Sequence, residues 1–308
     1  MSIFVILSLL LGLPYAYTQI TINEIENKYP PLGNYKKINN LNIHYTDIGA
    51  GPLVVLLHSQ PANERQFYLL KEQLKKNYRV ISIDRPGMGY SEGPKEKTEI
   101  RLSLQAKIIS KLIKDITQEK PLVVGHSYGG ALALAYALNN EDDIKGLILV
   151  NTASHAWPSD KVWLPFKIIS SPLIGNIFAN TYAMIYGKST IEQSANDNFP
   201  NNLPSKNYME NVAGELTLRP QNLRSYAFDA INLRNALKEQ SKKYHKIKLP
   251  ITIIAGSNDR VTPNKIHSFQ LHQEIKHSSL IKVDGVEHSI PELKPGVIEE
   301  EIRKMLSK

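Results

Sequence analysis

The chain has 308 residues, of which 42% are hydrophobic and 21% are charged, as in an ordinary globular protein. It contains no cysteine, so disulfides, cysteine–zinc sites and cysteine nucleophiles are excluded. Lysine and arginine number 37 against 29 acidic residues, which gives a net charge of +8. The basic residues are dispersed and accompany no recognition motif, so we expect a solvated basic surface and no nucleic-acid partner.

An uncharged apolar run of 11 residues, Ile3–Leu13, lies near the start of the chain. Its length suits the hydrophobic region of a secretory signal, whereas a membrane span needs about 20 residues. Cleavage before Gln19 would place Ala16 at position −3 but a slightly large Thr18 at position −1, and no basic residue precedes the run. An uncleaved membrane anchor is the alternative, and the lack of an amphipathic pattern disfavours a helix of the folded domain. We expect residues 1–18 to be a signal peptide or anchor of an exported or membrane-anchored protein, and a cytoplasmic location is disfavoured.

From Asn34 onward, strand and helix patterns alternate, which predicts a mostly parallel sheet covered by helices. An antiparallel hairpin is expected first, at Tyr35–Ile38 and Leu41–Tyr45. The other expected strands are Leu53–Leu57, Arg79–Ile83, Leu122–Gly125, Gly146–Val150, Ile251–Ala255 and Leu280–Val283. The expected helices of the core are Glu64–Lys76, Glu99–Thr117, Tyr128–Leu138, Pro263–Ile275 and one from Pro295.

The alternation stops over residues 153–245, where helical stretches, two tryptophans and several prolines occur without a clear strand. An insertion of this length is a subdomain and not a loop. Open α/β sheets bind their ligands at the carboxyl ends of the strands, so we expect the insertion to cover that edge as a helical cap. The core is then formed by residues 19–152 and 246–308.

A G-x-S-x-G sequence lies at Gly125–Gly129, between an apolar strand and a helix rich in alanine and leucine. This is the context of a nucleophile elbow, in which the serine has a strained backbone and an exposed hydroxyl. Small residues are needed two positions before and after Ser127, because side chains there would collide with the turn. The amides and the positive dipole end of the following helix favour an oxyanion. Ser127 is therefore the predicted nucleophile, and a glycine-rich helix start without catalysis is the alternative.

A serine hydroxyl needs a base, and the chain has nine histidines. His288 follows the last strand, where a loop can carry its imidazole to the elbow, whereas the pattern around His267 indicates a helix-surface residue. Asp259 follows the preceding strand, while the strand before that one ends in the neutral Asn151. The order Ser127, Asp259, His288 is typical of hydrolases with this elbow, and it predicts Asp259 as the acid. A solvated histidine and a turn-capping aspartate are the structural alternatives.

These segments resemble the α/β-hydrolase superfamily, and the resemblance covers nearly the whole chain after the leader. His58–Pro61 is similar to the H-G-x-P oxyanion loop of that superfamily, Asp84–Ser91 to its D-x-P-G-x-G-x-S segment, and Gly125–Gly130 to its elbow. Residues 218–244 and 250–288 resemble a bacterial branch with an inserted helical cap and a leader. The resemblance implies an α/β-hydrolase fold and the hydrolysis of an ester, an amide or another hydrolysable substrate.

Two backbone amides are expected to bind the oxyanion. Tyr128, directly after the nucleophile, supplies one, and the resemblance implies Gln60 as the other, with an ordinary loop glutamine as the alternative. Ser59 departs from the usual glycine of the oxyanion loop, and Glu287 stands where a glycine usually precedes the histidine and could add negative charge there. Ser127 argues against haloalkane dehalogenases and epoxide hydrolases, which use an aspartate nucleophile.

The candidate residues predict acyl transfer to water through an acyl-enzyme, with no metal or organic cofactor. We expect a serine hydrolase for small or medium apolar esters, because apolar cap residues would enclose the pocket. A C–C bond hydrolase, an amidase or lactonase, and a perhydrolase are alternatives on the same residues. Outside enzymes, the alternative is a non-catalytic binding protein on the same fold. The expected partner is a small-molecule substrate. Association with a membrane through the leader is also possible if the leader is not cleaved.

Overall fold

The computed structural model describes residues 3–94, 102–159 and 163–307. Within these residues the core is one sheet of eight strands in the order β1-β2-β4-β3-β5-β6-β7-β8. The strands are β1 (Asn34–Ile38), β2 (Leu41–Ile48), β3 (Leu53–Leu57), β4 (Arg79–Ile83), β5 (Leu122–His126), β6 (Gly146–Val150), β7 (Ile251–Gly256) and β8 (Ser279–Val283). The pairs β1–β2 and β2–β4 are antiparallel and all other pairs are parallel. The predicted α/β fold with a mostly parallel sheet is confirmed.

Helices cover both faces of the sheet, so the central strands are buried throughout. On β3, Val55 and Leu57 belong to the core cluster on the α3 and α4 side, and Val54 and Leu56 to the cluster on the α2 and α12 side. Alternate residues of a strand point to opposite faces, which explains the continuous apolar run. The helical elements of the core are η1 (Glu64–Phe67), α2 (Tyr68–Leu74), α3 (Leu102–Ile116), α4 (Tyr128–Asn140), η3 (Glu141–Asp143), α10 (Ser268–Glu274), α11 (Ile290–Leu293) and α12 (Pro295–Leu306).

Two predicted helices are shorter than expected. The stretch predicted over Glu64–Lys76 is a 3-10 turn followed by α2, and the stretch predicted from Pro263 becomes an α-helix only at Ser268. The predicted start of α3 at Glu99 lies outside the described residues. The positions of the strands determine where the site residues lie, so these differences leave the framework of the site unchanged.

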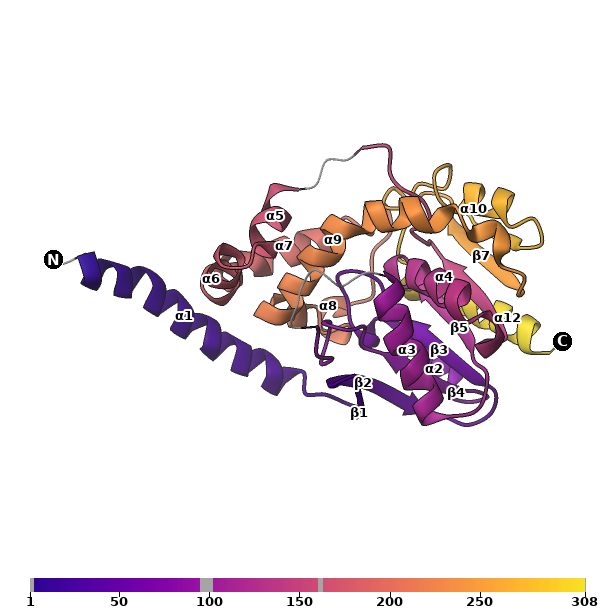
Figure 1. Cartoon of the computed structure of the whole chain (residues 1–308), viewed down its shortest axis with the longest axis horizontal. Helices are drawn as coiled ribbons and strands as arrows, with labels where there is room; N and C mark the ends of the chain where they lie inside the picture. The colour runs from indigo at the N-terminus through magenta and orange to yellow at the C-terminus, as the bar shows by residue number, and fades with distance from the viewer. Residues whose placement is uncertain (1–2, 95–101, 160–162, 308) are drawn as a thin grey trace.

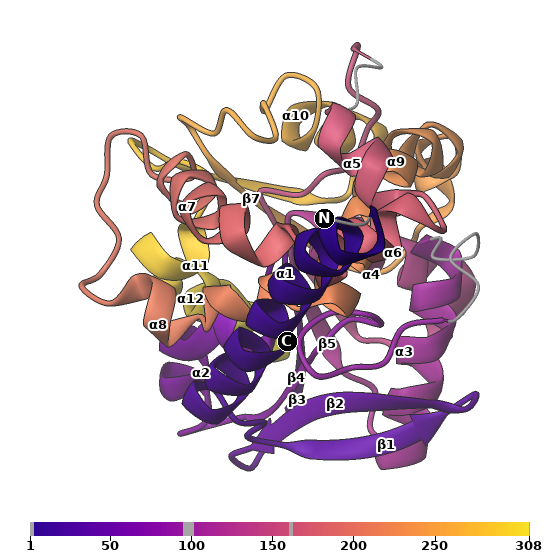
Figure 2. The same cartoon turned by 90° about the vertical axis from the view of Figure 1, so that its left-hand side faces the viewer.

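Between β6 and β7 the described residues form helices and irregular segments. The elements are α5 (Leu164–Ser170), α6 (Ile174–Asn180), α7 (Ala183–Asn196), α8 (Tyr208–Asn211), η4 (Gly214–Leu218), α9 (Pro220–Ser241) and η5 (Tyr244–Lys246). Prolines stand in the first turns of α5 and α9, where the missing N–H of proline costs no helical hydrogen bond. Figures 1 and 2 show α5, α6 and α7 gathered at one end of the molecule, beside the N-terminal helix.

The N-terminal helix α1 (Ile3–Lys28) runs without a break through the expected boundary after residue 18. The start of its first half projects from the body of the molecule, as Figure 1 shows, while the carbonyl oxygen of Leu10 accepts a 2.8 Å hydrogen bond from the Tyr182 hydroxyl of the insertion. Its second half contacts the insertion: Thr18 donates a 2.9 Å hydrogen bond to the carbonyl oxygen of Thr181, and Ile25 is buried. The second half of α1 is therefore part of the folded domain, which its apolar pattern did not indicate. No helix in the described ranges is long and apolar enough to cross a membrane.

Candidate active site

Ser127 stands at the turn between β5 and α4, with φ 55° and ψ −116°. Two glycines permit this turn. A Cβ on Gly125 would lie 2.4 Å from the carbonyl oxygen of Gly129, and a Cβ on Gly129 would lie 2.0 Å from that of Leu57. Both distances are far below van der Waals contact, so the small residues predicted around the serine are sterically required. The strained serine at the tip of a strand–turn–helix is the geometry of a nucleophile elbow.

Asp259 and His288 come from the loops after β7 and β8, and the structure brings them together. The Nδ1–H of His288 donates to Asp259 Oδ2 at 2.9 Å, and the Thr262 hydroxyl donates to the same oxygen at 2.7 Å. Burial opposes ionisation of Asp259, but the neighbouring His288 and the bonds from Thr262 outweigh it and hold the pKa of the carboxyl below its usual value. In the described residues the Ser127 hydroxyl makes no hydrogen bond to the His288 ring. Such bonds commonly tighten only when substrate binds.

Asn151, at the end of β6, holds the His288 loop in place, a role that the sequence analysis missed. Its Nδ2 donates to the carbonyl oxygens of Glu287 at 2.9 Å and His288 at 2.8 Å, and its Oδ1 accepts from the N–H of Gly256 at 2.8 Å. The side chain is fully buried. The only signal in the sequence was a neutral polar residue directly after a buried strand, at the position considered for the acid.

Two further histidines lie close to the site, and both are buried. His126 donates through Nε2 to the carbonyl oxygen of His288 at 2.9 Å, and burial lowers the pKa of His126 to about 3. The prediction that His267 lies on a helix surface is wrong. It precedes α10, faces inward beside the Trp157 ring at 4.5 Å, and accepts from the N–H of Ser154 at 3.2 Å. Burial lowers the pKa of His267 to about 4, so both imidazoles are neutral structural groups.

The loop after β3 is held by side chains that explain the serine in place of glycine. The Ser59 hydroxyl accepts from Gln66 Nε2 at 2.6 Å, and the Ser59 N–H donates to Gln66 Oε1 at 2.8 Å. Gln60 donates through Nε2 to the carbonyl oxygen of Tyr226 on α9 at 2.9 Å. Within the described ranges, neither the backbone N–H of Gln60 nor that of Tyr128 donates to another protein group. Both amides are thus available to an oxyanion.

The other departure from the superfamily pattern, Glu287, is directed away from His288. Its carboxylate accepts hydrogen bonds from the N–H of Asn201 at 2.9 Å and from the side chain of Asn202, both in the insertion. Burial opposes ionisation, but these bonds outweigh it and hold the pKa of Glu287 below its usual value. The negative charge is therefore used to attach the insertion to the histidine loop.

Contacts within the Asp84–Ser91 segment hold its turns close to the candidate site. Asp84 accepts from His44 Nδ1 at 2.7 Å and from the N–H of Tyr90 at 2.8 Å, and a Cβ on Gly89 would meet the Asp84 carboxylate at 2.2 Å. The glycine is required because that carboxylate occupies the space of a side chain and because its φ is +49°.

Arg85 connects the insertion to the candidate site through a fully buried ion pair. Its Nη1 lies 2.9 Å from Asp229 Oδ2 on α9, and its Nη2 donates to the carbonyl oxygen of Ser59 at 3.2 Å. The guanidinium also lies 4.1 Å from the centre of the Tyr128 ring, next to the nucleophile. Burial raises the pKa of Asp229, while Arg85 opposes that shift. One arginine therefore contacts the expected oxyanion loop, the elbow and the insertion.

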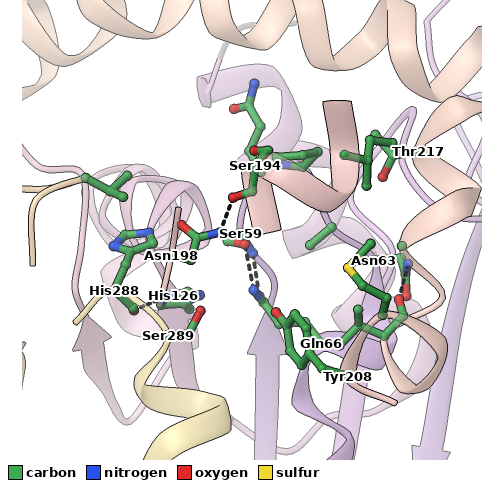
Figure 3. A pocket seen from close by; sticks show the side chains of 18 residues that line it. Ser59, Asn63, Gln66, His126, Ser194, Asn198, Tyr208, Thr217, His288 and Ser289 are labelled. Atoms are coloured by element: carbon green, nitrogen blue, oxygen red, sulfur yellow. Dashed lines mark hydrogen bonds between the residues drawn. The ribbon is translucent and has the colours of Figure 1, made fainter. Parts of the chain in front are cut away.

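Two cavities adjoin the candidate residues. The larger one has a volume of about 380 Å³, and its lining includes Ser127, Trp157, Trp163, Phe166, Tyr226 and Leu233. The smaller one has a volume of about 80 Å³ and is drawn in Figure 3; its lining includes His288, Ser59, Asn63, Ser194, Asn198 and Thr217. Gln60 and Val261 line both cavities. Among the described residues no three histidine or acidic side chains are grouped so as to hold a metal ion.

Comparison with known proteins places this geometry in a family. A family model described as the alpha/beta hydrolase fold matches residues 52–168. The chain is 28% identical over 236 residues to a 2-hydroxy-6-oxononadienedioate/2-hydroxy-6-oxononatrienedioate hydrolase of Paraburkholderia phymatum, which covers 72% of this chain and 76% of that protein. The family model and the curated relatives support a hydrolase of the α/β-hydrolase superfamily.

Solved structures share the same fold. An esterase from Exiguobacterium antarcticum is 22% identical with a TM-score of 0.71, over 90% of this chain and 100% of that one. A bacterial membrane phospholipase A is 18% identical with a TM-score of 0.68, over 99% of this chain and 96% of that one. The second match covers nearly the whole chain and therefore includes α1.

Proposed function

We propose that this hydrolase cleaves acyl esters by way of an acyl-enzyme, with Ser127 as nucleophile, His288 as base and Asp259 as the acid. The observation that carries the proposal is the strained elbow serine beside a histidine whose Nδ1–H is bound by a buried carboxylate at 2.9 Å. That hydrogen bond fixes the tautomer in which Nε2 can accept a proton, and the carboxylate stabilises the imidazolium that forms.

In this mechanism His288 takes the proton of the Ser127 hydroxyl as the oxygen attacks the carbonyl carbon of the ester. The backbone amides of Gln60 and Tyr128 stabilise the oxyanion of the tetrahedral intermediate. The intermediate collapses, the bond to the alcohol oxygen breaks, and His288 gives its proton to that oxygen. Water then attacks the acyl-enzyme with His288 again as base, which releases the acid and restores the serine.

We propose that the insertion acts as a cap and that the larger cavity binds the acyl group. Aromatic residues of the insertion, Trp163 and Phe166, line it together with Ser127. Its volume of about 380 Å³ suits small or medium acyl chains. Each methylene that gains apolar contact contributes about 0.8 kcal/mol, roughly a fourfold rise in kcat/KM. A series of p-nitrophenyl esters should therefore reach a maximum at short or medium acyl length. A rise that continues through long chains would contradict an enclosed acyl pocket.

The direct test of the nucleophile is labelling by a fluorophosphonate probe. We expect labelling and ester hydrolysis to disappear in Ser127→Ala and to persist in Ser110→Ala, a control that removes a buried serine of α3 outside both cavities. Thermal unfolding of both variants shows whether the fold is retained. Labelling that persists in Ser127→Ala would show that another residue is the nucleophile.

A C–C bond hydrolase is the second candidate, because the curated relative from Paraburkholderia phymatum is named for an action on dienedioates. Among the described residues that line the two cavities, Arg234 alone carries a permanent positive charge, and its Nε already donates to the carbonyl oxygen of Trp157 at 3.0 Å. A dicarboxylate has two charges to neutralise, so this lining favours an ester. Efficient turnover of a 2-hydroxy-6-oxodienedioate without turnover of esters would favour the second candidate.

We also propose that the N-terminal segment directs the protein to a membrane or through it. Leu9, Leu10, Leu11, Leu13 and Tyr15 of α1 are exposed, and together these positions cover about two thirds of the helix circumference. A helix that is apolar over most of its circumference suits lipid better than a protein surface that covers one side. The burial of Thr18 favours an uncleaved anchor over a cleaved signal. Fractionation of cells that produce the full chain tests this proposal, together with the N-terminal mass of the purified protein. Recovery of the intact chain in the cytosol would contradict it.

A further inference from the structure

We propose that the smaller cavity binds the alcohol part of the ester, and that this alcohol is small, uncharged and carries several hydroxyl groups, with glycerol as the model. The inference rests on the proposed function. It assigns a role to the cavity that is not occupied by the acyl group. It is carried by the position of the cavity, by the chemistry of its lining and by its size.

The position of the cavity matches the place of the alcohol in the proposed reaction. The acyl carbon becomes bonded to Ser127, which lines the larger cavity, while the alcohol oxygen receives its proton from His288, which lines the smaller one. Gln60 and Val261 line both cavities, so the two cavities are neighbours on the serine side and the histidine side of the candidate site. A substrate that spans them places its acyl chain on the serine side and its alcohol on the histidine side.

The lining of the smaller cavity is polar without charge. Its lining residues include no lysine, arginine, aspartate or glutamate. Ser194 and Asn198 come from α7 and the segment after it, Thr217 comes from η4, and Figure 3 shows all three around the cavity. Asn198 Nδ2 donates to the carbonyl oxygen of Ser194 at 3.2 Å. In the described part of the chain, Asn198 Oδ1 and the hydroxyls of Ser194 and Thr217 have no hydrogen-bond partner.

The two hydroxyls can donate and accept hydrogen bonds and the amide oxygen of Asn198 can accept them, which suits hydroxyl groups on a ligand. The remaining polar side chains of the cavity are already engaged. Ser59 is bonded to Gln66, and Asn63 Nδ2 donates to the carbonyl oxygen of Val212 at 2.8 Å. A phosphate or a quaternary ammonium group would find no opposite charge in this cavity, and burying an unpaired charge is costly. The lining therefore selects a neutral polyol over a charged alcohol.

The size of the cavity sets the upper limit of the alcohol. A volume of about 80 Å³ corresponds to roughly five to eight water-sized positions, at about 10–15 Å³ for each. Glycerol, with six non-hydrogen atoms, matches this size, whereas a hexose is too large. An ester of glycerol with one small or medium acyl chain is the substrate that fits both cavities.

The test compares three butanoate esters, of ethanol, glycerol and choline, with the full-length protein. We expect kcat/KM for the glyceryl ester to exceed that for the ethyl ester about tenfold, which corresponds to two neutral hydrogen bonds. The choline ester should be the poorest substrate. Ser194→Ala and Asn198→Ala should each lower kcat/KM for the glyceryl ester about threefold and leave kcat/KM for the ethyl ester unchanged. Ser189→Ala is the matched control, because Ser189 is exposed on the same helix α7.

The outcomes separate this inference from the proposed function. Equal rates for the ethyl and glyceryl esters of the parent protein overturn the alcohol site and leave the esterase proposal standing. A preference for the choline ester overturns the neutral lining as the selecting feature. Variants that lower both rates equally show a structural role for these side chains. If the parent hydrolyses no ester and Ser127 is not labelled, the proposed function itself fails. The ratio of kcat/KM for the glyceryl ester to that for the ethyl ester, measured on the parent protein, tests the alcohol site even if a variant does not fold.

Discussion

The buried ion pair between Arg85 and Asp229 offers a quantitative test of how the insertion is attached to the core. The perturbation is Asp229→Asn, which keeps the shape of the side chain and removes its charge. Both partners are fully buried, with 2.9 Å between Arg85 Nη1 and Asp229 Oδ2. After the substitution the guanidinium remains buried without a counter-charge, because its other side-chain partner is the neutral Gln105 at 3.1 Å.

Removing one partner of a buried pair costs about 3–5 kcal/mol, and we expect the lower end here because asparagine can still accept a hydrogen bond from Arg85. For a chain of this size about 1 kcal/mol corresponds to roughly 2 °C in Tm, so the midpoint should fall by roughly 6–10 °C. The matched control is Asp47→Asn, which breaks the partly exposed pair of Arg79 and Asp47 at 2.6 Å. Exposed pairs contribute about 0–1 kcal/mol, so the control should shift Tm by about 2 °C or less.

Denaturant unfolding of the parent, Asp229→Asn, Arg85→Met and the double variant completes a double-mutant cycle. We expect a coupling energy of about 1–3 kcal/mol, because the double variant leaves no unpaired charge. Arg85→Met also releases the carbonyl oxygen of Ser59, so its kcat/KM should fall by about an order of magnitude through the loop that carries Gln60. A coupling energy near zero, with Asp229→Asn as stable as the Asp47→Asn control, would refute the reasoning.

Three further predictions concern the acid, the pH dependence and the N-terminal helix. Asp259→Asn should lower kcat by about 10³–10⁴ yet leave more activity than loss of the nucleophile, because the carboxylate orients the imidazole without touching substrate; near-parental kcat would place the acid elsewhere. Burial lowers the pKa values of His58 and His126 to about 3. The unfolded chain, with histidine pKa values of about 6.5, binds these protons first, so the free energy of unfolding should fall as pH drops from about 6.5 towards 3. Each histidine contributes about 2 kcal/mol to this loss at pH 5. Denaturant titrations at pH 5 and pH 7 measure the two free energies of unfolding. Equal free energies at the two pH values would contradict the burial of these rings. A chain that starts at Gln19 should fold and hydrolyse esters, with a loss of about 1 kcal/mol for the hydrogen bond of Thr18, and an unfolded product would show that the first half of α1 belongs to the core.

Local patterns of the sequence determined the sheet and the elbow. Strands such as Leu53–Leu57 and Gly146–Val150 are predictable because burial on both faces requires a continuous apolar run. Ser127 is predictable because a strand–turn–helix with this backbone admits only small residues at Gly125 and Gly129. In each case the physical requirement acts within a few residues, so it leaves a readable pattern.

The contacts that organise the site were decided by tertiary structure. Asn151 bonds to a loop 137 residues further along the chain, and Arg85 pairs with a residue 144 positions away. The hydrogen-bonding groups of these side chains are common to many positions, so their types alone do not reveal their partners. His267 was misjudged for the same reason, because its burial depends on Trp157 and on where α10 begins.

The burial of helix α1 and the lining of the smaller cavity also could not be predicted from the sequence, because both depend on packing. The apolar pattern of α1 marks no preferred face, and the partners of its second half, among them Met184 and Leu218, are supplied by the insertion. The polar groups of the smaller cavity come from segments as distant as Ser59 and Ser194, and each of them alone would suit a solvated surface. A cavity is the space left after helices and loops have packed. Its shape and lining therefore depend on the whole fold, whereas a strand or a turn depends on its own residues.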